Sequence, residues 1–327
     1  FRGQRVPCFE NPSRARFVEQ ALRAAGHALH AADRDSAPLL AQVHAPRYLD
    51  FLRTAWQQWL VLDAANAQQQ PFPSVWPVRT LRSDVEPDNF IARLGLYSMD
   101  NGSPMVAGTW AAAKAAADAA ASAAAALRAG ERAVFCATRP PGHHAGPDFM
   151  GGYCFINNAA VCAQALRVGG AARVAVLDVD YHHGNGTQAI FYDRADVLFV
   201  SIHGDPRTEY PFYLGHADET GTGAGQGCNL NLPLAAGSNV AAWFDALEVA
   251  CARVQRHRPD ALVVSLGLDT FAGDPISQFA LQRADFTHLG QRLARLGLPT
   301  ALLLEGGYAA AELGDNAVAV LAGIEGG

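Results

Sequence analysis

One short stretch, LDVDYHHGNG from Leu177 to Gly186, places carboxylate and imidazole side chains at alternate positions. Asp178, Asp180 and His182 would share one face of a strand that continued through them, because side chains alternate across a strand. Buried carboxylates are costly unless they are paired or bind metal. We therefore predict a divalent metal site built from Asp180 and His182, with Asp269 at the end of another strand as the third ligand.

Two aspartates and one histidine leave a coordination position open for water, which is typical of catalytic zinc sites. Oxygen ligands would also accept Fe(II), Co(II) or Mn(II), so the residues indicate a metal more firmly than they identify it. The alternative is an ordinary aspartate–histidine pair at a strand end. Polar residues at the ends of the other apolar runs favour the metal site.

Two adjacent histidines, His143 and His144, follow the rigid turn Arg139-Pro140-Pro141-Gly142. We interpret them as bases beside metal-bound water, with Asp178 and Asn185 orienting the two imidazoles. The imidazole on Asp178 should be protonated more often, which leaves the one on Asn185 better suited to act as the base. Tyr308, in Glu305-Gly306-Gly307-Tyr308, could stabilise an oxyanion; the alternative is a tyrosine that simply packs.

These residues follow short apolar runs that read as buried strands and alternate with helical patterns. Such alternation predicts one α/β domain with a parallel sheet covered by helices on both faces, and ligands bind at the carboxyl ends of its strands. The expected strands are 133–137, 174–179, 197–202, 261–268 and 300–304, and the expected helices near them are 157–167, 239–257 and 284–296.

The N-terminal third reads as helices over about 12–25, 44–60 and 106–129, with an irregular stretch over 66–105. The net charge of −6 argues against nucleic-acid binding. Six cysteines without a C-x-x-C pair indicate reduced thiols and a cytoplasmic protein, and no signal peptide or membrane span is evident. The chain begins with Phe1, so we expect its natural N-terminus to be missing.

Five blocks resemble the signature motifs of the arginase-fold deacetylase superfamily, which includes histone deacetylases and bacterial acetylpolyamine amidohydrolases. They are RPPGHHAG, GGYCFINN, DVDYHHGNGTQ, SLGLDTFAGDP and EGGY. HAPRYLDFLRTAW and PSVWPVRTLR are more similar to the acetylpolyamine branch. The resemblance implies a single deacetylase domain over 1–327 and zinc-dependent hydrolysis of an acetylamide.

The resemblance also implies a role for each matching residue. Asp180, His182 and Asp269 would bind one zinc ion, His144 would be the general base with His143 as its electrostatic partner, and Tyr308 would donate a hydrogen bond in the transition state. Asn185 matches the amide of the acetylpolyamine and class II members. A structural potassium ion would be held by Asp178, Ser201 and Ile202, with backbone groups of Asp180 and His182.

The substrate tunnel of the family has aromatic walls, and the matching or nearby residues here are Tyr153, Tyr210, Ile276 and Gly152. The stretch 66–105 stands where the family carries an insert for dimerisation and substrate gating. Its acidic residues could attract a polycation or simply be solvated: Asp84, Glu86, Asp88 and Asp100. We assign Glu86 to substrate binding, and note that Gly102 stands near the place expected for an acidic specificity residue.

We therefore expect a homodimeric enzyme that acts on a small acetylated amine, above all an acetylpolyamine, and on neither nucleic acid nor membranes. The nearest alternative is a deacetylase of acetyl-lysine peptides or of other small amides. A dinuclear manganese ureohydrolase would need more metal ligands than these blocks provide. A binding module without activity is disfavoured by the intact ligand set and by Tyr308.

Overall fold

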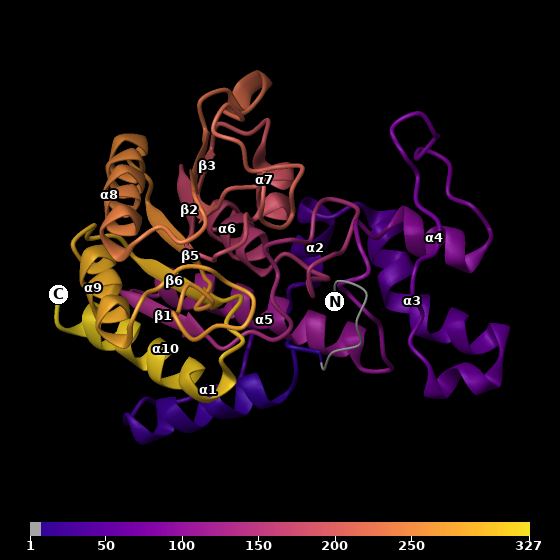
Figure 1. The fold of residues 1–327 in the computed structure, drawn as a ribbon, viewed down its shortest axis with the longest axis horizontal. Helices are drawn as coiled ribbons and strands as arrows, with labels where there is room; N and C mark the ends of the chain where they lie inside the picture. Colours follow the sequence, from indigo (N-terminus) through magenta and orange to yellow (C-terminus); the bar gives the residue numbers. More distant parts are fainter. Residues whose placement is uncertain (1–7) are drawn as a thin grey trace.

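The computed structural model describes residues 8–327, and its centre is a six-stranded, wholly parallel sheet (Figure 1). The strand order is β1-β6-β5-β2-β3-β4. In the register of the central strands, Asp178 at the end of β2 lies between Ser201 of β3 and Ser265 of β5. The strands are β1 Ala133–Cys136, β2 Val174–Asp178, β3 Val197–Gly204, β4 Asn229–Leu234, β5 Ala261–Leu266 and β6 Thr300–Leu304.

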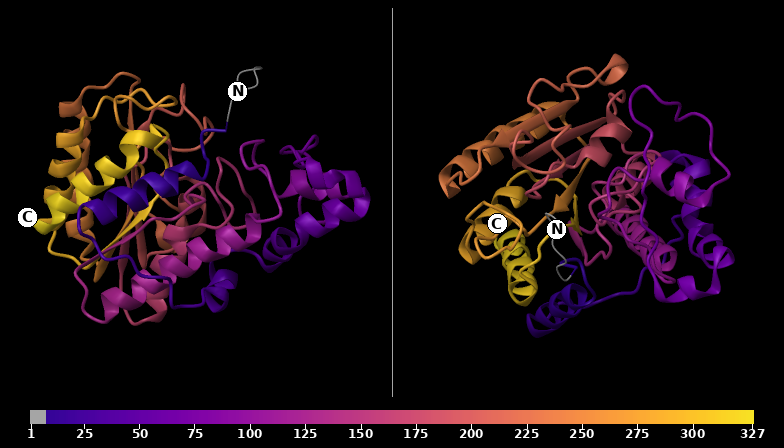
Figure 2. Two further views of the ribbon diagram at one scale, coloured as in Figure 1. Left: turned by 90° about the horizontal axis from the view of Figure 1, so that it is seen from below. Right: turned by 45° about the vertical axis from the view of Figure 1, so that its right-hand side comes forward.

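Helices cover both faces of the sheet because successive strand side chains point to opposite sides. Val174 and Val176 of β2 face one hydrophobic core, and Ala175 and Leu177 face the other. The first core is closed by α2 Ala37–Val43, α3 Pro46–Leu62, α4 Phe90–Leu96, α5 Thr109–Arg128, α6 Asn158–Val168 and α7 Asn185–Phe191. The second is closed by α1 Ser13–Ala24, α8 Val240–His257, α9 Arg283–Ala294 and α10 Ala310–Glu325 (Figure 2).

The prediction of one α/β domain is confirmed, and all five expected strands are present within a few residues. The sixth strand, β4, was missed because NLNLPL carries two asparagines and a proline, which an edge strand tolerates. Four helices were also not predicted from the sequence: α2, α4, α7 and α10. Three of them have 7 residues, which is too short for a clear helical period.

The strand that carries Asp178 ends at that residue. Asp180 and His182 lie in the loop that follows, so the strand does not continue far enough to present all three side chains on a single face. The loop brings Asp180 and His182 together by its own hydrogen bonds, which are described below.

Residues 63–99 project from the body of the sheet, as the right side of Figure 1 shows for α3, α4 and the chain between them. This segment contains a short 3-10 helix, η1 Ala64–Gln68. Its base is anchored by stacked rings of Trp59 and Phe90, 5.8 Å apart. Large apolar side chains are exposed at the end of α3, namely Val61 and Leu62, and along this segment: Phe72, Val75, Val78, Leu81 and Val85. No described helix is long and apolar enough to cross a membrane.

Candidate active site

Asp180, His182 and Asp269 meet at the carboxyl end of the sheet, where β2 and β5 run side by side. Their ligand-type atoms all lie within 4.8 Å of one another, and all three residues are buried. The Nδ1 atom of His182 lies 3.2 Å from Oδ1 of Asp180 and 3.1 Å from Oδ2 of Asp269. The structure thus brings together the three residues that the sequence predicted as metal ligands.

Backbone amides hold the two carboxylates in place. Asp180 accepts hydrogen bonds from the amides of His182 and Gly306, both at 2.8 Å, and Asp269 accepts one from Tyr181 at 2.8 Å. Because these donors come from different strand ends, the ligand cluster is fixed by the sheet as a whole. Preorganised carboxylates of this kind need little rearrangement to receive a cation.

The electrostatics of the cluster fit a divalent cation. Burial, and then the charge of Asp180, raises the pKa of Asp269 to about 8. Burial alone would lower the pKa of His182, but hydrogen bonds to Asp180 and Asp269 raise it to about 10. A proton on the imidazole of His182 therefore balances the buried negative charge of the carboxylates. Two carboxylates and one imidazole also form a donor set that zinc accepts.

The two adjacent histidines pair with the partners that the sequence suggested. Nδ1 of His143 lies 2.9 Å from Oδ2 of Asp178, and Nδ1 of His144 lies 2.7 Å from Oδ1 of Asn185. The ring centroids of the two histidines are 4.0 Å apart, and the ring of His144 is 6.1 Å from that of His182. Both histidines therefore stand directly beside the ligand cluster.

Their pKa values shift in opposite directions. Burial opposes the charge on His143, but Asp180 and Asp178 outweigh it and raise the pKa to about 10. Burial, and then the neighbouring charge of His143, holds the pKa of His144 well below its usual value. His144 is therefore neutral at pH 7; with its Nδ1–H donated to Asn185, its Nε2 lone pair is free to accept a proton.

Tyr308 is held by a residue that the sequence analysis did not single out, Asp274. Oδ2 of Asp274 accepts the backbone N–H of Tyr308 at 2.6 Å, and Oδ1 accepts that of Ile276 at 3.0 Å. A second missed residue, the buried Arg14 of α1, donates to the carbonyl of Gly307 at 2.7 Å and lies 5.0 Å from the centre of the Tyr308 ring. No pattern in the sequence around Arg14 indicates that it would contact Gly307 and Tyr308.

Aromatic side chains line the approach to the cluster. The Tyr210 ring is 5.0 Å from that of His144, and the Tyr153 ring is 5.7 Å from that of Tyr308. A Cβ at Gly152 would lie 2.4 Å from Cδ2 of His144, so only glycine fits between these walls. Tyr153, Tyr210 and Gly152 are therefore grouped beside His144 and Tyr308. Ile276 contacts Asp274, which also binds Tyr308, through its backbone N–H.

Glu86 lies elsewhere. Its carboxylate accepts from the Tyr97 hydroxyl at 2.8 Å and pairs with Arg93 at 3.4 Å, and neither partner is one of the wall residues Tyr153, Tyr210 and Gly152. The acidic residue at the walls is Asp100, whose Oδ2 accepts the Tyr210 hydroxyl at 2.8 Å and the Gly152 amide at 3.2 Å.

The residues expected to hold potassium lie below the ligand cluster. Asp178 and Ser201 are register partners on neighbouring strands, and Ile202 follows in β3. Oδ1 of Asp178 accepts the amide of Asp180 at 3.1 Å, and the Ser201 hydroxyl lies 2.8 Å from Nδ1 of His203. Part of the hydrogen-bonding capacity of Asp178 and Ser201 is therefore already used within the chain.

Comparison with known proteins identifies relatives along almost the entire chain. Residues 8–324 match the histone deacetylase domain family. The chain is 54% identical over 325 residues to acetylpolyamine amidohydrolase 2 of Pseudomonas aeruginosa, covering 99% of this chain and 93% of the relative. It is 43% identical to the acetylpolyamine amidohydrolase of Mycoplana ramosa over 99% of this chain and 94% of that one.

A solved structure shows the same architecture. The crystal structure of acetylpolyamine aminohydrolase from Burkholderia pseudomallei superimposes with a TM-score of 0.92 at 40% identity, covering 98% of this chain and 92% of that one.

Proposed function

Because this chain belongs to the histone deacetylase family, we propose that it is a zinc-dependent amidohydrolase that removes acetyl groups from acetylpolyamines. The observation that carries this proposal is the buried cluster of Asp180, His182 and Asp269 beside a neutral His144. Relatives named acetylpolyamine amidohydrolases, 54% and 43% identical, support the choice of substrate.

Zinc held by the three side chains would lower the pKa of a bound water molecule and polarise the acetyl carbonyl. Nε2 of His144 accepts the proton of the attacking water. The hydroxyl of Tyr308 donates a hydrogen bond to the carbonyl oxygen as negative charge develops there. A protonated histidine of the pair then delivers a proton to the leaving nitrogen, and the products are acetate and a free amine.

Asp100 supports selectivity for a cationic substrate. Its carboxylate is held by the Tyr210 hydroxyl and the amides of Gly152 and Gly102, and it forms no ion pair with any described residue of the chain. An unpaired carboxylate on the tunnel wall would attract the free ammonium group of an acetylated polyamine. We therefore assign this role to Asp100 in preference to Glu86, which is already paired with Arg93.

We further propose that two copies associate through residues 63–99, that the enzyme works in the cytoplasm, and that potassium binds at Asp178 and Ser201. The exposed apolar side chains of the projecting segment support the dimer, because such patches commonly mark interfaces. Six free cysteines are consistent with a reducing compartment.

Steady-state kinetics with zinc-loaded protein would test the substrate. We expect kcat/KM for acetylputrescine and acetylspermidine to exceed that for a neutral acetyl-lysine peptide. A peptide advantage, or equal weak rates on both, would retain the chemistry but assign the enzyme to a broader class of deacetylase.

Replacing Asp100 with asparagine separates the charge of this residue from its shape. D100N keeps an acceptor for Tyr210 but removes the negative charge, so KM for acetylputrescine should rise about tenfold while the neutral peptide is unaffected. The control is D84N, because Asp84 is an exposed aspartate of the same sequence stretch, 66–105, and is paired with Arg82. Equal effects on both substrates would exclude a charge-based role for Asp100.

A further inference from the structure

Glu305, directly after β6, is a buried carboxylate to which the proposed reaction gives no role. It is 0% exposed, and none of the ion pairs in the described chain includes its side chain. Arg14 reaches the backbone carbonyl of Glu305, at 2.5 Å, and not the carboxylate. The imidazole of His143 lies within 4.8 Å and favours the charged carboxylate, but no ion pair joins the two side chains. A buried acidic group without a direct cationic partner is costly and calls for a physical explanation.

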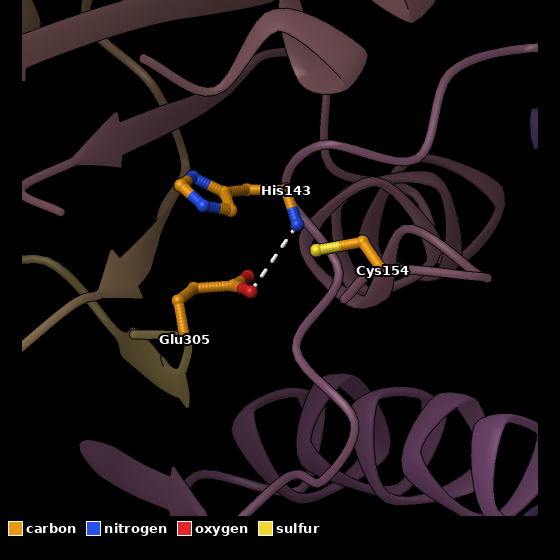
Figure 3. A group of neighbouring side chains, drawn as sticks. All are labelled: His143, Cys154 and Glu305. Atoms are coloured by element: carbon orange, nitrogen blue, oxygen red, sulfur yellow. Dashed lines mark hydrogen bonds between the residues drawn. The ribbon is translucent and has the colours of Figure 1, made fainter. Parts of the chain in front are cut away.

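The carboxylate of Glu305 points at the backbone of the loop that carries His143 and His144 (Figure 3). Oε2 accepts the amide of Gly142 at 2.5 Å and the amide of His143 at 3.2 Å, while Oε1 has no hydrogen-bond partner among residues 8–327. These two amides immediately precede the side chains of His143 and His144. Glu305 therefore contacts the loop at the point from which both imidazoles extend.

The opposite side of the same loop is also held. The carbonyl of His143 accepts the amides of Gly186 and Thr187, at 3.0 and 3.1 Å, from the start of α7. Asp178 and Asn185 orient the two rings, but they do not bind the loop amides. Glu305 is thus the side chain that binds the backbone N–H groups of Gly142 and His143.

A second metal site at this position is disfavoured, although Glu305, His143 and Cys154 lie close enough together to hold an ion. Nδ1 of His143 is already bonded to Asp178. Burial raises the pKa of the Cys154 thiol well above its usual value, which disfavours the thiolate that a metal would bind. Two well-placed hydrogen bonds to the loop account for the position of Glu305 more simply.

We propose that Glu305 is a positioning residue: its two hydrogen bonds to Gly142 and His143 fix the backbone that aims both imidazoles at the metal ligands. This inference rests on the proposed deacetylase function. What the two amides require is an acceptor oxygen, and a glutamine side chain offers one without the charge. Methionine has a similar length but offers no oxygen, so it leaves both amides unpartnered.

The test compares E305Q with E305M in zinc-loaded protein. A displacement of catalytic groups by about 1 Å costs about 100-fold in rate, so we expect E305M to lose about that much kcat with nearly unchanged KM and zinc content. E305Q should stay within about threefold of the wild type, because both hydrogen bonds remain available. The control E312M makes the same change at an exposed glutamate of α10.

Hydrogen exchange of the peptide over residues 139–146 provides a readout that does not depend on activity. Exchange of the Gly142 and His143 amides should accelerate about tenfold or more in E305M and remain protected in E305Q. If E305M does not fold, E305Q still decides: unprotected amides in a fully active variant, or protected amides in an inactive one, would overturn the proposal. Wild-type activity on an acetylated amine is measured first. An inactive wild type would reject the proposed deacetylase function itself, whereas the variant outcomes above, with an active wild type, would reject only the role of Glu305.

Discussion

His143 and His144 have the same side chain and contact each other, yet their pKa values shift in opposite directions. The difference comes from their partners, because Asp178 and Asp180 favour a charged His143, whereas burial and the charge of His143 favour a neutral His144. Two adjacent residues can therefore act as a base and as a cationic partner. This division was predicted from the difference between the carboxylate of Asp178 and the amide of Asn185.

Tyr308 is the residue at which the proposed transition-state hydrogen bond is tested. Y308F should reduce kcat by about 100-fold or more without loss of zinc, because it removes a donor to the developing oxyanion. Steady-state kinetics and metal analysis by emission spectrometry would measure both quantities. Unchanged kcat in Y308F would exclude the oxyanion role.

Asp274 offers a second test of the same hydroxyl, because it binds the Tyr308 amide at 2.6 Å. If Asp274 acts through Tyr308, D274A should lower kcat about 30-fold in the wild type but less than about threefold in a Y308F background. The control is D315A, which removes an exposed aspartate paired with Arg283. Equal losses in both backgrounds would point to a general structural role for Asp274.

At the level of elements, one buried histidine joins the N-terminal helices to the loop that carries His143 and His144. His44, between α2 and α3, lies 2.7 Å from the carbonyl of Gly146 through Nδ1, and its Nε2 accepts the amide of Asn157 at 3.0 Å. Asn157 caps α6 and donates to the carbonyl of Ala145 at 3.0 Å. The region that supports the projecting segment is thereby coupled to the loop of the histidine pair.

This histidine should make stability depend on pH. Burial lowers the pKa of His44 to about 4, so between pH 6.5 and 4 the unfolded chain binds a proton that the folded chain excludes. His44 therefore leaves the free energy of unfolding unchanged above pH 6.5. Between pH 6.5 and 4 it lowers this free energy by roughly 1.4 kcal/mol per pH unit. H44N keeps a donor for Gly146 and should show a correspondingly flatter dependence in urea unfolding. Parallel curves for the two proteins would contradict this assignment.

The projecting segment should behave as an interface. V78E combined with L81E places two charges on side chains that are 61% and 59% exposed in a single copy, so the fold should tolerate them. We expect light scattering to show a change from two copies to one. The control V168E alters a valine that is 62% exposed on the body of the molecule. A wild-type protein that is already monomeric would reject the proposed dimer.

For the molecule as a whole, the cluster of Asp180, His182 and Asp269 joins the loops that follow β2, β5 and β6. Without a cation, the buried carboxylates of Asp180 and Asp269 are balanced only by protonated groups. A chelator should therefore lower Tm by about 10 °C, because a tightly bound ion stabilises the folded state alone. D180N should lack this response to the chelator. An identical Tm with and without the chelator would argue against a bound metal.

Much of this protein can be predicted from local sequence, because local physics determines it. Apolar runs of five to eight residues marked five of the six strands, and their order along the chain predicted the parallel sheet. Residue chemistry identified the candidate ligands, the histidine pair and Tyr308. Where local signals were weak, as in β4 and the short helix α4, the prediction failed.

Only the tertiary structure shows which distant residues support this chemistry. The strand order places β6 between β1 and β5, so Glu305 meets Gly142 across 163 positions of sequence and Gly306 meets Asp180 across 126. Arg14, Asp274 and Asp100 likewise acquire their roles from contacts that no local pattern encodes. Hydrophobic periodicity determines which segments are buried. The packing of the complete sheet determines which strand ends are neighbours, and the candidate site consists of residues at those neighbouring ends.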